Sequence, residues 1–257
     1  MNIVVYIKQT FDTEAKIVLD GSGKIDANGV NLIINPYDEF AIEEGIRLKE
    51  KLGGEVTVVS IGGARAQEAI RTALAMGADK GVLVTDAALE NADEWANAEV
   101  LAKAVSQIPC DILLAGRIAI DDGASQIGVR VAEILNVPSI SSVLKLDIAG
   151  THATVTREID GGTETIEADL PLVITAQKGL NDPRYPSVAG IMKAKKKPLQ
   201  TLSLADLGLS AGDLAQKMSV LKYTLPDARQ AGRKIPGDAA PAAQELARLL
   251  HEEAKIL

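Results

Sequence analysis

The apolar positions in the first half of the chain form short continuous runs separated by amphipathic stretches. The run 3–7 (IVVYI) is typical of a strand buried on both faces, whereas apolar residues in 38–52 recur at helical spacing. The alternation predicts strands at 3–7, 56–61, 82–84 and 112–115 and helices at 38–52, 64–76, 94–108 and 124–135. Strands and helices that alternate in this way predict an α/β fold, a Rossmann-like parallel sheet with helices on both faces.

Beyond Pro138 the pattern changes to short runs with no helical stretch between them. These runs, at 141–146, 153–159, 163–168 and 172–176, are rich in residues that favour strands, and Gly161-Gly162 predicts a hairpin turn. We therefore expect a β-rich extension of the same domain, with antiparallel strands at an edge. The next segment, 178–198, is too polar and too often interrupted by Gly and Pro to predict an element.

The composition changes again after Pro198, so we expect an α/β domain at 1–199 and a C-terminal arm at 200–257. The arm ends in an amphipathic helix that begins at Pro241. Its apolar stripe consists of Ala243, Leu246, Leu250, Ala254 and Leu257. A helix of this kind docks either on another chain or on its own sheet, and the pattern leaves both open.

Composition narrows the classes of function. The 257 residues carry 27 Lys+Arg and 35 Asp+Glu, and a net charge of −8 argues against a general nucleic-acid binder. No apolar run of membrane-spanning length occurs, and the first residues lack the layout of a secretory signal. A single cysteine, Cys110, allows no internal disulfide, so we expect a cytoplasmic location. His152 and His251 have no metal-ligand spacing, so any redox role requires an organic cofactor.

The first candidate site is Asn35-Pro36-Tyr37-Asp38, at the start of the helix 38–52. Asn35 suits an N-cap, Pro36 the first helical position and Asp38 the first turn, so helix capping explains this run. The other interpretation is a nucleotide pocket, because this loop lies at the edge of the sheet where such folds bind ligands.

The second candidate is the loop 116–128 (GRIAIDDGASQIG), between a strand and the helix 124–135. Gly123 permits a close turn, and the amides of Ala124, Ser125 and Gln126 would face an anion at the helix start. Asp121 and Asp122 oppose this interpretation, since two carboxylates repel phosphate unless they face away or bind a ribose. A simple helix start is the alternative.

Other motifs fail in detail. The segment 21–24 (GSGK) lacks the spacing of a phosphate loop and predicts a hairpin turn, and no G-x-G-x-x-G fingerprint occurs. The segment 123–127 misses the nucleophile elbow, because Ile127 stands where the second glycine belongs. A self-sufficient NAD dehydrogenase and a serine hydrolase are both disfavoured, and no catalytic residue is assigned.

A run of lysines lies at 193–197 in an otherwise acidic chain. It consists of Lys193, Lys195, Lys196 and Lys197. Such a run is either a solvated loop or a surface that steers an acidic partner. Val188, Ile191 and Met192 favour the second interpretation, because apolar side chains in an exposed loop can anchor an interface.

The stretch 155–175 (VTREIDGGTETIEADLPLVIT) resembles the signature of the electron transfer flavoprotein β subunit. The matching positions are Arg157, Asp160-Gly161-Gly162, Glu164, Pro171 and Val173-Ile174. The resemblance continues through NPYDEFAIEEGIRLKE, IRTALAMGAD, GRIAIDD and NDPRY…IMKAKKKP, and covers about the first 225 residues.

The resemblance implies an electron carrier, not a self-contained enzyme. Such a chain pairs with an α subunit that holds most of the FAD site, and the arm 200–257 would contact that subunit. The family's β subunit commonly buries a structural AMP. Carried over, the AMP pocket would comprise Tyr6, Asn35, Pro36, Tyr37, Asp38, Ile61, Gly116, Arg117, Ile118, Ala119, Ile120, Asp121, Asp122, Gly123, Ala124, Ser125, Gln126 and Ile127.

The resemblance also implies docking partners. The segment 176–198 resembles the recognition loop that docks on acyl-CoA dehydrogenase-type flavoenzymes, from which electrons pass on to a quinone oxidoreductase. The implied recognition residues are Arg184, Tyr185, Val188, Ile191, Met192, Lys193, Lys195, Lys196 and Lys197. Val188 takes the place of the family's apolar anchor, which is usually the larger leucine.

Two alternatives remain. The segment 121–128 (DDGASQIG) fully matches neither the common form (D-D-D-x-N-Q-T-G) nor that of electron-bifurcating relatives (D-G-D-T-A-Q-V-G), which hold a second FAD in place of AMP and use NADH as donor. The IMKAKKKP loop resembles the common form, so AMP is the preferred expectation. A stand-alone adenine-nucleotide-binding enzyme or module is the alternative of another class.

Overall fold

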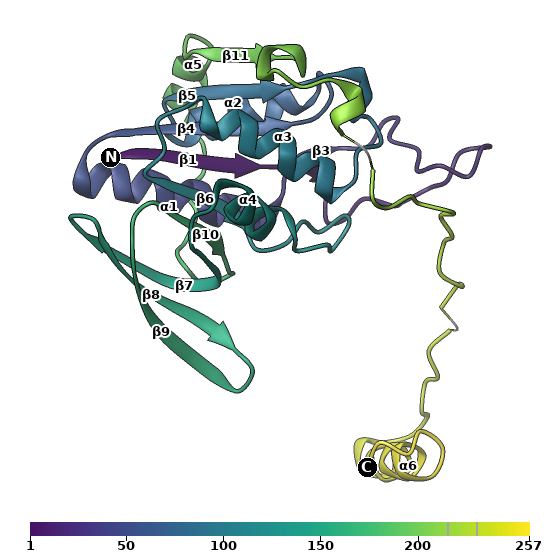
Figure 1. The fold of residues 1–257 in the computed structure, drawn as a ribbon. Coiled ribbons are helices and arrows are strands. Elements are labelled where there is room, and N and C mark those ends of the chain that lie inside the picture. The colour runs from purple at the N-terminus through teal and green to yellow at the C-terminus, as the bar shows by residue number, and fades with distance from the viewer. Residues whose placement is uncertain (215, 230) are drawn as a thin grey trace. The chain divides into compact units, whose positions relative to one another are not determined.

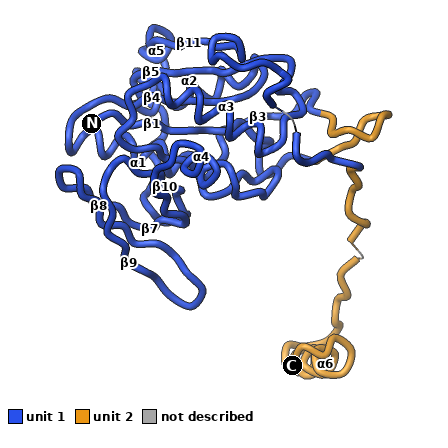
Figure 2. Tube along the Cα trace, in the orientation of Figure 1, with its two compact units in different colours: residues 1–16, 27–221 blue, residues 17–26, 222–257 orange. Residues whose placement is uncertain are grey.

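A nine-stranded sheet organises the larger of the two units into which the chain divides (Figures 1 and 2). The computed structural model describes residues 1–214, 216–229 and 231–257. The larger unit comprises 1–16 and 27–221, and the smaller one 17–26 and 222–257. The strand order is β11-β5-β4-β1-β6-β10-β7-β8-β9.

The predicted α/β alternation is confirmed. The strands of its first half are β1 (Asn2–Ile7), β4 (Glu55–Ile61), β5 (Lys80–Val84) and β6 (Ile112–Gly116), and they pair in parallel. The helices between them are α1 (Pro36–Leu52), α2 (Ala66–Met76), α3 (Glu94–Ser106) and α4 (Ile127–Leu135). A short antiparallel ribbon of β2 (Gln9–Phe11) and β3 (Leu32–Ile34) lies between β1 and α1 in the chain.

Helices cover both faces of the sheet. Successive side chains of a strand point to opposite faces, so each strand contributes to two separate hydrophobic cores. Ile3 and Val5 of β1 pack with α1 and α2, whereas Val4 of the same strand packs with α3 and α4. Ile3, Val4 and Val5 are all fully buried, which explains why β1 is a continuous apolar run in the sequence.

The β-rich extension is also confirmed as an antiparallel edge. It consists of β7 (Ser139–Ala149), β8 (His152–Ile159) and β9 (Gly162–Asp169), and the β8–β9 turn contains Gly161 at φ 82°. The fourth strand of this group, β10 (Leu172–Ala176), instead returns to the middle of the sheet, where it pairs in parallel with β6 and β7. Its five residues are all buried, as a central position requires.

The segment expected to lack elements contains α5 (Val188–Ala194), and β11 (Leu199–Leu202) follows it as a parallel edge strand beside β5. The prediction that 178–198 contains no helix or strand was therefore wrong. Gly190 has poor helix propensity, but a Cβ there would lie 2.3 Å from the Ala75 carbonyl oxygen, so the glycine lets α5 pack closely on α2. Three one-turn 3-10 helices complete the larger unit, at Ala87–Leu89, Ala205–Leu207 and Ala211–Asp213.

Two predicted helix bounds differ from the structure by more than two residues. The helix α4 begins at Ile127 rather than at 124, because Ser125 adopts a left-handed backbone conformation with φ 56° that a right-handed helix excludes. In the smaller unit, α6 (Ala239–Glu252) ends before Ala254 and Leu257, so these two residues lie outside the helical stripe. Leu246 of this stripe is exposed.

Candidate functional site

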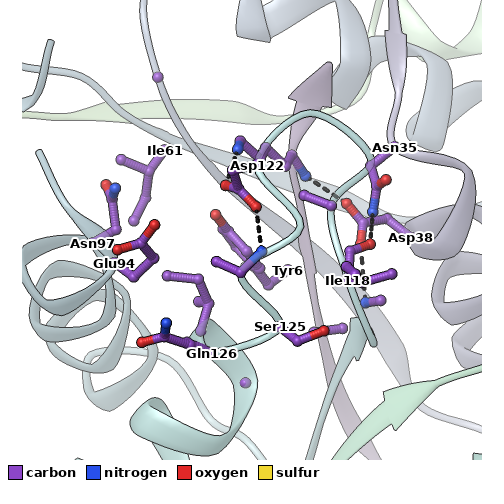
Figure 3. A pocket seen from close by; sticks show the side chains of 18 of the residues that line it. Tyr6, Asn35, Asp38, Ile61, Glu94, Asn97, Ile118, Asp122, Ser125 and Gln126 are labelled. Carbon is purple, nitrogen blue, oxygen red and sulfur yellow. Dashed lines mark hydrogen bonds and ion pairs between the residues drawn. The ribbon is translucent and has the colours of Figure 1, made fainter. Parts of the chain in front are cut away.

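A cavity of about 240 Å³ lies at the carboxyl ends of β1, β4 and β6 (Figure 3). Tyr6, Ile61 and Gly116 bring the three strand ends to its wall. Figure 3 shows Glu94 and Asn97, from the first turns of α3, beside Ile61 on one side of the view, with Asn35 and Asp38 on the other. Open parallel α/β sheets bind their ligands at this edge.

Most residues of the predicted pocket line this cavity. They are Tyr6, Asn35, Asp38, Ile61, Gly116, Arg117, Ile118, Ala119, Asp122, Ala124, Ser125, Gln126 and Ile127. The remaining predicted residues belong to the same two loops but not to the cavity lining: Pro36, Tyr37, Ile120, Asp121 and Gly123. The fold thus brings the two candidate loops, about eighty residues apart in the chain, to one site.

Asn35 and Asp38 hold the loop of this site in place. Asn35 is the N-cap of α1 and Asp38 lies in its first turn, as predicted, but the Asn35 side chain makes no capping bond. Its Nδ2 donates to the Ile118 carbonyl (2.9 Å) and its Oδ1 accepts from the Ile120 amide (3.2 Å). Asp38 accepts from the Gly116 amide (2.9 Å) through Oδ1. Pro36 does occupy the first turn, as predicted. The start of α1 therefore fixes the loop that follows β6.

Burial determines the protonation of the Asp38 carboxyl and of the nearby Tyr6 phenol. Asp38 is 3 % exposed, and burial raises the pKa of its carboxyl to about 7, although hydrogen bonds from Lys8, Asn35 and Gly116 oppose the shift. Burial, followed by the nearby carboxylates of Asp38 and Asp122, likewise raises the pKa of Tyr6, so its phenol stays protonated.

The two loop carboxylates share one lysine, which offsets part of the charge that would repel phosphate. The Lys8 ammonium lies 2.9 Å from Asp121 Oδ1 and 2.6 Å from Asp122 Oδ2. The other Asp122 oxygen accepts from the Ala124 amide (2.9 Å). The Ala124 amide therefore already has a partner within the loop. The prediction that the amides of Ala124, Ser125 and Gln126 all face an anion was wrong for Ala124.

Arg117 is the cation of the cavity wall that has unused hydrogen-bonding capacity. Its guanidinium lies over the Tyr37 ring, 5.9 Å from the centroid, and its backbone amide donates to the Ala176 carbonyl. Its buried Nε has no hydrogen-bond partner among the described residues.

The sequence analysis missed Lys8, Glu94 and Asn97 in the cavity lining. A signal for Lys8 was present, because a cation directly follows the first predicted strand and must lie at the ligand-binding edge. Glu94 and Asn97 lie at the beginning of a predicted helix, but the sequence does not tell which of its turns faces the cavity.

The predicted recognition segment combines exposed apolar and basic side chains. Tyr185 is 94 % exposed, Val188 81 % and Met192 61 %, and Ile191 lies beside them on α5. Lys193, Lys195 and Lys196 are also exposed. Solvation of this many large apolar groups in one short segment is unfavourable, so the surface is typical of a docking site.

Arg184 and Lys197 are instead engaged inside the chain. Arg184 Nε lies 2.8 Å from Glu43 Oε2, and its Nη1 lies 2.7 Å from Glu50 Oε1. Lys197 donates to the Leu74 carbonyl (2.9 Å) and to that of Ala78 at the end of α2. Arg184 and Lys197, the first and last of the predicted recognition residues, thus hold this part of the segment to α1 and to the α2 region.

No group of three or more His, Cys, Asp or Glu side chains in 1–214, 216–229 and 231–257 could hold a metal ion. Within the same part of the chain, no helix is long and apolar enough to cross a membrane.

Comparison with known proteins gives consistent similarities. The family model of the electron transfer flavoprotein domain matches residues 22–207. The chain is 47 % identical to an electron transfer flavoprotein subunit beta from Bacillus subtilis, over the full length of both chains. It is 48 % identical to the same subunit from Syntrophomonas wolfei, covering 100 % of this chain and 98 % of the relative. It is 42 % identical to the human subunit, covering 91 % and 92 %.

Proposed function

The chain belongs to the electron transfer flavoprotein β-subunit family, and we propose that it is the small subunit of a flavin-containing electron carrier. It pairs with an α subunit, accepts electrons from acyl-CoA dehydrogenase-type flavoenzymes and passes them to a quinone oxidoreductase. FAD, held mainly by the α subunit, supplies the redox chemistry when bound. This chain contributes binding, orientation and electrostatics, and none of its side chains acts as a catalytic acid, base or nucleophile.

The nucleotide proposed for the cavity at the ends of β1, β4 and β6 is AMP. Its volume of about 240 Å³ lies below the usual range of about 300–1,000 Å³ for ligand pockets. Because FAD has more than twice as many non-hydrogen atoms as AMP, this volume favours the mononucleotide over a second FAD. The volume of the cavity is the observation that carries this choice.

Individual residues then have separate roles in holding the nucleotide. Ile61 supplies an apolar wall, which suits a base. The start of α4 favours an anion through its helix dipole. Asn35 and Asp38 touch the loop rather than the ligand and hold it in place.

The recognition segment is proposed to dock the dehydrogenase, with Val188 as its apolar anchor. The exposure of Val188 supports this role, and the neighbouring lysines would steer an acidic partner. Valine is one methylene smaller than leucine, which lowers the anchor's burial energy by about 1 kcal/mol. Val188→Ala is expected to weaken dehydrogenase binding; unchanged affinity would contradict the anchor role. The arm 200–257 is proposed to contact the α subunit, which would cover exposed residues such as Leu246.

A nucleotide census of the complex tests the proposal. The complex is purified from its native host and denatured, and the released FAD and AMP are counted per heterodimer. One FAD and one AMP are expected. Two FAD and no AMP would indicate an electron-bifurcating carrier, and a chain that purifies alone with neither nucleotide would overturn the carrier proposal.

A further inference from the structure

We propose that Lys8 is a positioning residue of the nucleotide site, which holds Asp121 and Asp122 in place and offsets their charge so that a phosphate-bearing ligand can bind beside them. The inference rests on the proposed nucleotide function. It concerns a residue outside the two loops predicted to form the nucleotide pocket, and it assigns Lys8 an action through the carboxylates rather than on the ligand.

The backbone of Lys8 is fixed on both sides by α1. Its amide donates to Asp38 Oδ2 (2.7 Å), and its carbonyl accepts from the Asn35 amide (2.9 Å). The lysine side chain therefore starts from a fixed point at the end of β1. From there its ammonium reaches across to the loop between β6 and α4, which lies more than a hundred residues later in the chain.

The contacts of this ammonium determine how the loop folds. Nζ lies 2.9 Å from Asp121 Oδ1 and 2.6 Å from Asp122 Oδ2, and the same Asp121 oxygen accepts from the Asp122 amide (2.9 Å). Asp122 Oδ1 accepts from the Ala124 amide (2.9 Å). Figure 3 shows Asp122 held in this way above the cavity, so both of its oxygens are directed to partners within the protein.

Charge is the second part of the inference. Lys8 together with Asp121 and Asp122 carries one net negative charge, and without the lysine the loop would carry two. Burial lowers the pKa of Lys8, but its bonds to Asp121 and Asp122 outweigh this and raise it overall, so the ammonium stays charged at neutral pH. Because Asp122 lines the cavity, an unpaired carboxylate there would act directly on a bound phosphate.

The test compares four variants of the complex of this chain with its α subunit: Lys8→Met, the double variant D121N/D122N, the triple variant K8M/D121N/D122N, and the control Lys103→Met. Lys103 is exposed in the last turn of α3, so the control removes one positive charge away from the cavity wall. Each complex is refolded with a series of AMP concentrations, and the AMP retained per complex is measured. Adenosine, which lacks the phosphate, is measured in parallel.

The expected result is that Lys8→Met raises the half-saturating AMP concentration on the order of tenfold, whereas Lys103→Met and wild type agree within about twofold. The triple variant should retain AMP as tightly as the double variant, because the lysine has no carboxylate charge to offset once Asp121 and Asp122 are replaced by asparagine. Adenosine retention should not differ between Lys8→Met and wild type.

Three results would overturn the inference, and they are distinguishable from failure of the proposed function. If Lys8→Met retains AMP as wild type does, the lysine is dispensable. If the triple variant binds AMP more weakly than the double variant, Lys8 acts on the phosphate itself; this comparison also decides the matter if Lys8→Met alone fails to fold. If wild type retains no AMP, the proposed nucleotide is wrong and the inference fails with it.

Discussion

Gly116, the last residue of β6, gives the sharpest prediction, because Asp38 and the start of α1 pack directly against it. A Cβ at Gly116 would lie 2.2 Å from Asp38 Oδ1 and 2.8 Å from the Tyr37 backbone. The Tyr37 backbone belongs to the first turn of α1 and moves only with the helix, whereas Asp38 Oδ1 could rotate away only by breaking its hydrogen bond to the Gly116 amide. Gly116→Ala must therefore displace either the end of β6 or the start of α1.

The cost follows from two contributions. Overpacking of a closely packed position costs about 1–3 kcal/mol, and loss of the Gly116 amide bond to the buried Asp38 carboxyl costs about 1–3 kcal/mol more. We expect Gly116→Ala to lower the free energy of unfolding by about 3 kcal/mol, which corresponds to a fall in Tm of about 10 °C for a chain of this size. The residues Arg117 and Ile118, which line the cavity, would shift with it.

Urea unfolding followed by circular dichroism measures this change. The matched control is Gly63→Ala, just beyond the end of β4 in the same sheet, where a Cβ would meet nothing within 4 Å. We expect the control to stay within about 0.5 kcal/mol of wild type. If Gly116→Ala and the control have the same stability, the contact between β6 and α1 is not as close as the structure has it, and the reasoning is refuted.

Three further predictions concern Asp38, Arg184 and Lys197. Because the pKa of Asp38 is raised to about 7 in the folded chain, the unfolded state binds fewer protons than the native state between about pH 4 and 7, so stability falls as pH rises through this window. Urea unfolding at pH 5, 6 and 7 should show a slope shallower by up to about 1.4 kcal/mol per pH unit in Asp38→Asn; parallel curves would contradict this assignment. Arg184→Met should speed hydrogen exchange in 178–187, since Glu43 and Glu50 lose their partner on that segment, and unchanged exchange would show that other contacts hold it. Lys197→Met should destabilise the chain by about 1 kcal/mol, because carbonyls at the end of α2 lose their donor; the exposed Lys195→Met is the control, and equal stability of both variants would rule out the capping role.

The parallel sheet was predictable because the burial of its strands is reflected in their apolar sequence. Positions 3–7 are apolar throughout, since the strand is covered by helices on both faces. The same reasoning failed for α5 and β11. Both are short, and both are stabilised by neighbours that precede them by about a hundred residues, namely α2 and β5. A local pattern holds no record of such contacts.

The candidate site divides in a similar way. Sequence placed Asn35, Asp38 and the loop after β6 at one edge, because the carboxyl ends of parallel strands meet there. It placed Asn35 and Asp38 correctly at the start of α1 but did not foresee that their side chains bond the loop after β6, because a side chain that can cap a helix can equally bond a loop that the fold brings near. It also left open whether Asp121 and Asp122 face an anion, which depends on Lys8 at the end of another strand.

The sequence by itself determined the fold class, the edge of the sheet that holds the candidate site and the family to which the chain belongs, since apolar periodicity and motif order are local or strictly sequential properties. Only the tertiary structure decided which polar groups are already committed to one another. It pairs Lys8 with Asp121 and Asp122, bonds Arg184 to Glu43, and leaves the buried Arg117 Nε unpartnered among the described residues. Hydrogen bonds and ion pairs act over about 3 Å, so these assignments exist only after distant segments have been packed together.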